Sequence, residues 1–110
     1  MDRLTTLTGA NFDQQVLRAG GPIAVEFMSY GCAHCRVIEP VLQQVAEMVA
    51  ATEKLFRVNI AVEQGLAEQY GIRGTPTLLM FLDGREVGRV EGPSPTAADL
   101  LRAVTAPFEA

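Results

Sequence analysis

The sequence predicts an α/β fold in which helices flank both faces of a mixed central β-sheet. Apolar runs typical of buried strands alternate with segments in which apolar residues recur at helical spacing. A tight turn at Asp83-Gly84 joins two later strand-like runs, which adds an antiparallel pair to the sheet. The chain has 110 residues, 48% of them hydrophobic, and we expect residues 1–110 to form one domain.

The first half of the chain predicts a helix, a strand and a longer helix. Residues 11–21 place apolar side chains on one face of a short helix, and a glycine pair ends it. The apolar, β-branched run from Ile23 to Met28 predicts a buried strand. From Cys32 to about Ala50 the apolar residues again fall at helical spacing, which predicts a helix with one face toward the core.

The second half predicts a strand near residues 55–60 and a short helix over residues 63–71. Residues 77–92 then read as the two strands of the hairpin. A last helix follows, and Thr96 and Asp99 stand near its start in an arrangement similar to a capping box.

Charge and hydropathy limit the kinds of partner. The net charge is −4, and the sequence lacks the cationic stripe with which proteins displace counterions from phosphates, so we expect no nucleic-acid partner. No run of about 18 apolar residues predicts a membrane span, and the N-terminus does not resemble a signal peptide. We therefore expect a cytoplasmic monomer, or a periplasmic or secreted protein if a signal peptide has been removed.

The segment "FMSYGCAHCRVIEP", residues 27–40, contains both cysteines and the only histidine of the chain. A disulfide between cysteines three positions apart closes too small a loop to hold a fold together. In a reducing compartment such a pair is typical of a redox site or a metal site. The two cysteines are therefore more consistent with chemistry than with structural stabilisation.

The spacing assigns different roles to the two thiols. Cys32 falls where a strand-loop meets a helix, so unpaired backbone N–H groups and the helix dipole stabilise its thiolate. Cys35 follows one turn later on the same side. Gly31 and Ala33 leave the surroundings of Cys32 open to a bulky partner. We expect Cys32 to attack and Cys35 to resolve the resulting mixed disulfide.

A metal site is the competing interpretation. Tetrahedral zinc needs four ligands, whereas this chain offers two cysteines and His34. Because His34 lies between the cysteines, joining all three on one ion would be strained. Two chains would have to share one metal through paired CxxC units, as a non-enzymatic binding module. We favour the redox site, which needs no metal and no organic cofactor beyond a Cys32–Cys35 disulfide.

Two segments carry a resemblance to a known family. "VEFMSYGCAHC" and "YGIRGTPTLLMF" resemble the active-site strand-loop and the loop before the central hairpin in the thioredoxin family, and the similarity runs from about Asn11 to Leu101. The resemblance implies the thioredoxin fold and thiol–disulfide exchange with protein disulfides or dithiols. It also implies a thiol reductant, such as a thioredoxin reductase or another thiol carrier.

The resemblance further implies a substrate groove beside the cysteines. The Thr75–Pro76 bond is expected to be cis, a form found in about 5–6% of X-Pro bonds in folded proteins. The backbone of Thr75 would pair with an extended substrate. Gly92 matches a glycine that lines the same groove, where the lack of a side chain admits a partner's backbone.

The resemblance also gives Glu26 a role. The family has a buried aspartate at this position, which relays a proton to the resolving thiol, here Cys35. Burial disfavours the ionised form of such a carboxyl. Arg57 matches a family lysine and is expected to pair with Glu26, which would favour the ionised form; the sequence leaves the balance open.

The active-site loop departs from the family pattern of tryptophan, cysteine, glycine, proline and cysteine. Gly31, Ala33 and His34 replace the tryptophan, glycine and proline, and Met28 replaces another family tryptophan. His34 would stabilise the Cys32 thiolate by donation or by charge, and so make the disulfide a better oxidant. We expect a reduction potential between the reference values of about −270 mV for thioredoxin and about −180 mV for protein disulfide isomerase.

Overall fold

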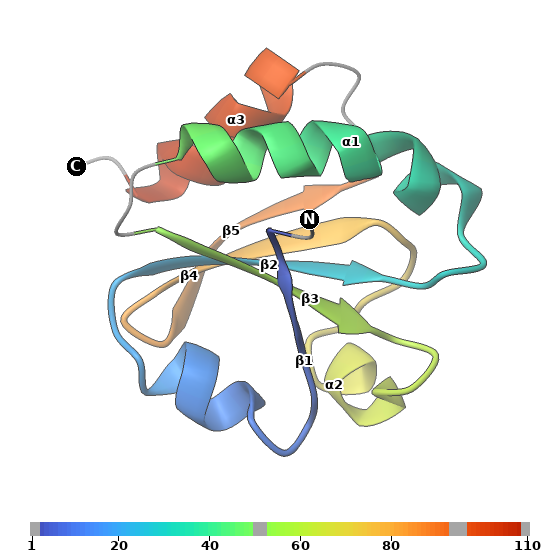
Figure 1. Cartoon of the computed structure of the whole chain (residues 1–110). Coiled ribbons are helices and arrows are strands. Elements are labelled where there is room, and N and C mark those ends of the chain that lie inside the picture. The colour runs from blue at the N-terminus through green and yellow to red at the C-terminus, as the bar shows by residue number, and fades with distance from the viewer. Residues whose placement is uncertain (1–2, 50–52, 93–96, 109–110) are drawn as a thin grey trace.

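The computed structural model describes residues 3–49, 53–92 and 97–108. A five-stranded sheet lies between two layers of helices (Figure 1). The elements in chain order are β1 (Thr5–Leu7), a π-helix (Asp13–Leu17), β2 (Pro22–Met28), α1 (Ala33–Met48), β3 (Lys54–Asn59), α2 (Gln64–Gln69), β4 (Thr77–Leu82), β5 (Arg85–Glu91), α3 (Ala97–Thr105) and a 3₁₀ turn (Ala106–Phe108).

The sheet is mixed, as the sequence predicts. Its strand order is β1-β3-β2-β4-β5, with β1, β3 and β2 parallel and β4 antiparallel to both of its neighbours. Asp83 and Gly84 both have positive φ, 51° and 84°, which suits a two-residue hairpin turn between β4 and β5. The predicted α/β architecture is confirmed.

Each face of the sheet is covered by helices whose apolar side chains fill a core. On one face lie α1 and α3, and on the other lie α2 and the π-helix (Figure 1). The buried stripe of α1 consists of Cys35, Ile38, Leu42 and Val45. This spacing of three and four residues keeps the first turn of α1 fixed against the sheet.

The structure differs from the sequence-based expectation at the chain ends. β1 was not predicted; it is a three-residue edge strand with one buried residue, Leu7, and is too short to show alternation. The capping arrangement proposed for the last helix includes Thr96, which lies outside the described residues. Beyond Thr105 the chain continues as a 3₁₀ turn, where Pro107 cannot donate the backbone hydrogen bond of a continuing helix.

Candidate active site

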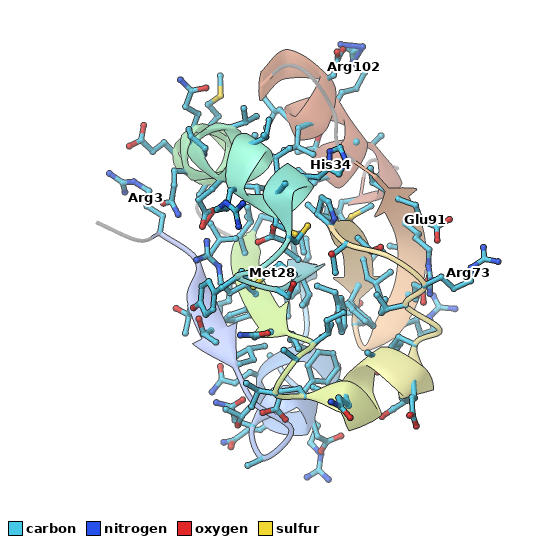
Figure 2. All side chains as sticks on the ribbon, turned by 90° about the vertical axis from the view of Figure 1, so that its right-hand side faces the viewer. Arg3, Met28, His34, Arg73, Glu91 and Arg102 are labelled. Atoms are coloured by element: carbon cyan, nitrogen blue, oxygen red, sulfur yellow. The ribbon has the colours of Figure 1, made fainter. Side chains whose placement is uncertain are left out.

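The two cysteines lie where β2 leads into α1. β2 ends at Met28, and Cys32 is the N-cap of α1, with extended backbone angles of φ −85° and ψ 114°. Figure 2 looks onto this side of the molecule, with His34 on the first turn of α1 and Met28 below it. Both cysteines are free thiols in the structure. The carboxyl end of a central strand and the amino end of a helix thus meet at one site.

The sulfur of Cys32 is partly exposed and receives hydrogen bonds from the helix that it caps. The backbone N–H of Cys35 donates to Cys32 Sγ at 3.1 Å. Burial raises the pKa of Cys32, but hydrogen bonds from the Cys35 thiol, from the Thr75 side chain and from the backbone of Cys35 and His34 outweigh it, so the pKa lies below the ordinary value of 9.0. The thiolate is therefore favoured at position 32.

Cys35 has the opposite environment. Its side chain belongs to the core stripe of α1, and the residue is 3% exposed. Burial, with a smaller contribution from its hydrogen bond to Cys32, raises the pKa of the Cys35 thiol to about 11. One thiol is thus exposed and acidic, and its neighbour is buried and stays protonated.

The predicted groove residues lie beside Cys32. The Thr75–Pro76 peptide bond is cis, and the Cys32 thiol donates to the carbonyl oxygen of Thr75 at 3.5 Å. The N–H of Gly92 donates to the carbonyl oxygen of Pro76 at 3.0 Å, which holds the end of β5 against this loop. Gly92 has φ 85°, a conformation that glycine adopts without strain. Thr75 thus contacts Cys32 directly, and Pro76 and Gly92 lie next to Thr75 at the same end of the sheet.

The residues around Cys32 in the loop and first turn are exposed. Gly31, Ala33 and His34 all belong to this surface. Within the described residues the imidazole of His34 makes no hydrogen bond; the contact with Cys32 comes from the backbone of His34 instead. The donation that the sequence suggested thus comes from a backbone group that any residue but proline would supply.

Glu26 and Arg57 lie opposite each other on neighbouring parallel strands, β2 and β3. Both are buried, 2% and 5% exposed, and Arg57 Nε lies 3.8 Å from Glu26 Oε1. Arg57 also donates from Nη2 to Glu39 Oε2 at 2.9 Å. The expected pair is thus part of a three-residue cluster in which one guanidinium lies between two carboxylates.

Sequence reasoning missed Glu39. It lies on α1 four residues after Cys35, and side chains at this spacing are neighbours on one helix face. This spacing could have indicated Glu39 from the sequence, but only together with the knowledge that β3 places Arg57 beneath the same face of α1.

A metal site is the alternative to a redox site. Among the described residues no three His, Cys, Asp or Glu side chains converge as metal ligands. A metal shared between two chains would need both thiols at the surface, whereas Cys35 is buried. In the same part of the chain, no helix has the length and apolar character that crossing a membrane requires.

Comparisons with known proteins agree with this fold. A sequence model of the family Thioredoxin matches residues 3–106. Thioredoxin 1 of Synechococcus elongatus is 37% identical over 103 residues, which cover 92% of this chain and 96% of that protein. A thioredoxin of Pseudomonas aeruginosa is 39% identical over 83 residues, 76% of this chain and 77% of that protein. A mutant thioredoxin from Halobacterium salinarum has a similar solved structure, with a TM-score of 0.85 and 27% identity over 99% of this chain and 94% of the other.

Proposed function

The chain belongs to the thioredoxin family and is a thiol–disulfide oxidoreductase of the thioredoxin type; we propose that Cys32 is its attacking residue and Cys35 its resolving residue. The observation that carries this assignment is the contrast between the two thiols. Cys32 caps α1 with its pKa lowered, whereas Cys35 is buried with its pKa raised to about 11. An attacking thiol needs exposure and ionisation, and a resolving thiol needs proximity.

In the proposed reaction, the Cys32 thiolate attacks one sulfur of a substrate disulfide. A bond forms between Cys32 and that sulfur, and the other substrate sulfur leaves as a thiolate. Cys35 then loses its proton and attacks Cys32 Sγ, which forms the Cys32–Cys35 disulfide and releases the second substrate thiolate. Two electrons pass from the cysteine pair to the substrate, and a thiol reductant must return them.

We propose that protein substrates bind in extended form along Thr75, Pro76 and Gly92. The Thr75 carbonyl lies 3.5 Å from Cys32 Sγ, so a chain paired with this backbone would bring its sulfur to Cys32. Gly31 and Ala33 would flank the same groove. We further propose that Glu26 promotes deprotonation of Cys35, with Arg57 as its charged neighbour.

His34 is proposed to make the disulfide more oxidising than that of ordinary thioredoxin. His34 is exposed in the first turn of α1, two residues after the cap Cys32 and directly before the buried Cys35. A protonated imidazole there would act as a counter-charge to the Cys32 thiolate and stabilise the reduced form. A stabilisation of about 1.4 kcal/mol corresponds to about 30 mV.

A trapping experiment tests the assignment of the cysteines. Reduced Cys35→Ser protein should accumulate a stable mixed disulfide with a protein substrate through Cys32, because no resolving thiol is present. Cys32→Ser protein should form no such adduct at a comparable rate. Equal trapping by the two variants would refute the assigned roles.

A further inference from the structure

The resolving step needs a group that takes the proton of Cys35. This thiol is 3% exposed and its pKa is raised to about 11, so bulk water does not reach it freely and does not ionise it at neutral pH. A base near a buried thiol accelerates such a step by accepting the proton as the sulfur attacks. The question is which group connects Cys35 to solvent.

A cavity of about 210 Å³ lies directly beside Cys35. Six described residues line it: Met28, Ser29, Tyr30, Cys35, Arg36 and Glu39. The cavity exceeds the volume of one water molecule, and hydroxyl, guanidinium and carboxylate groups among its lining residues can hold water by hydrogen bonds. Glu39 is the only carboxylate among these six residues.

Glu39 also reaches the surface. Its side chain is 35% exposed, whereas that of Glu26 is 2% exposed. Glu39 therefore connects the cavity to solvent, which Glu26 does not. On the side that faces the sheet, Glu39 accepts a hydrogen bond from Arg57 Nη2 at 2.9 Å. This bond links the carboxylate on α1 to β3 and holds it in place.

We propose that Glu39, held by Arg57, accepts the proton of Cys35 through water in this cavity and returns it to solvent. The inference rests on the proposed function, since it concerns the resolving step. In that step the Cys35 S–H bond breaks and the proton passes through water to the Glu39 carboxylate. The Cys35 electron pair forms the bond to Cys32 Sγ, and the bond from Cys32 to the substrate sulfur breaks. Glu39 acts on the sulfur only through water and does not touch the reacting atoms, so we class it as a positioning residue and not as a catalytic one.

Several charged or titratable groups surround Glu39 and enter the pH dependence of the resolving step. Arg36 and Cys35 lie on the same helix, Glu26 and Arg57 on the strands beneath, and Tyr30 on the loop across the cavity. Of these groups, Arg57 contacts the Glu39 carboxylate directly, and Arg36 donates to the carbonyl oxygen of Tyr30 at 2.8 Å.

The test separates the first attack from resolution with an aromatic disulfide probe, dithiobis(nitrobenzoate), added to the reduced full-length chain in a stopped-flow instrument. The first coloured thiolate leaves on attack by Cys32, at a rate that depends on probe concentration. The second leaves on resolution by Cys35, at a rate that does not. Glu39→Gln keeps an oxygen that accepts from Arg57 but removes the base.

We expect Glu39→Gln to slow the second phase by about tenfold or more and to leave the first phase within about twofold. Its second-phase rate should rise further with pH than that of the unmodified chain, because direct ionisation of Cys35 takes over. Glu47→Gln is the matched control, since Glu47 lies on the same helix and also pairs with an arginine, Arg3, away from the site. Glu39→Asp keeps a carboxylate and should resolve faster than Glu39→Gln.

An unchanged second phase in Glu39→Gln would overturn the proposal, as would equal slowing of both phases or a slower second phase in Glu39→Asp than in Glu39→Gln. A failure of the proposed function itself looks different. The unmodified chain would then release one coloured thiolate only and retain the other half of the probe on Cys32.

Discussion

Alkylation of the two thiols across a pH series measures the contrast on which the assigned mechanism depends. The perturbation is the pH itself, applied to the reduced chain with iodoacetamide in excess. At about pH 8, a thiol with a pKa of 9.0 is ionised to roughly a tenth, and one with a pKa of about 11 to roughly a thousandth. Because the pKa of Cys32 lies below 9.0, its thiolate is at least about a hundredfold more abundant than that of Cys35.

The two thiolates differ in nucleophilicity, and this difference reduces the expected ratio of their alkylation rates without removing it. A thiolate of higher pKa is the stronger nucleophile, and over two pKa units this offsets about a factor of ten. Cys32 should therefore react at least about tenfold faster than Cys35, and the burial of Cys35 adds a further steric factor. The rate for Cys32 should reach its midpoint below that of an ordinary thiol, and the rate for Cys35 should still rise near pH 11.

Mass spectrometry of quenched samples resolves the two sites if Cys32→Ser and Cys35→Ser chains are measured beside the unmodified one. Each variant isolates one thiol, although it also removes a hydrogen-bond partner of the other. Equal rates at the two positions in the unmodified chain would refute the reasoning. A Cys32 midpoint at or above that of a free thiol in water would refute it as well.

Four further predictions follow from the same geometry. Glu26→Gln should slow the concentration-independent phase of probe release by about tenfold or more and spare the first phase; equal effects on both phases would argue against a relay. His34→Ala should lower the reduction potential by about 30 mV in a glutathione redox buffer, because it removes the imidazole that is proposed to stabilise the thiolate; an unchanged potential would leave the backbone N–H as the only contribution of residue 34. Burial raises the pKa of Glu53 to about 7 from 4.5, so its contribution to stability is fully present below about pH 4.5 and is lost as the pH rises through 7. Because Glu53 is only partly buried, solvent screens part of this shift, and Glu53→Gln should gain about 1–2 kcal/mol over the unmodified chain between about pH 4 and pH 8 in urea unfolding; a pH-independent difference would contradict this. Leu42→Ala should lower the free energy of unfolding by about 2–5 kcal/mol, because Leu42 is fully buried between α1 and the sheet; a loss below about 1 kcal/mol would show that the core closes over the cavity.

Most of the fold could be predicted from the sequence, because the hydrophobic periodicity is strong in the elements that are buried. The run Ile23–Met28 has no exposed residue, and α1 has apolar positions at regular helical spacing, so β2 and α1 could be predicted to within a few residues. β1 could not be predicted, since its three residues pair only with β3 and take their conformation from that neighbour.

The candidate site likewise has features that follow from local sequence and features that depend on tertiary packing. The cap position of Cys32 and the place of Cys35 one turn later follow from local spacing, and both agree with the structure. The burial of Cys35 depends on how α1 packs against the sheet. The pairing of Glu39 with Arg57 depends on how α1 lies over β3, which no local pattern encodes. Backbone donation to Cys32 follows from its cap position, whereas the orientation of the His34 ring is not encoded by a local pattern.

The position of Arg57 explains why two carboxylates can share one site. A buried carboxylate alone is costly, and a buried ion pair often gains little net stability, so a cluster of this kind needs a reason other than stability. Arg57 lies between Glu26, which is enclosed by strands, and Glu39, which faces the cavity and solvent. Removal of either carboxylate changes how the guanidinium is held toward the other, because one Arg57 side chain contacts both. The two carboxylates are therefore coupled, and the rate of resolution in a Glu26→Gln, Glu39→Gln double variant should differ from the product of the two single effects.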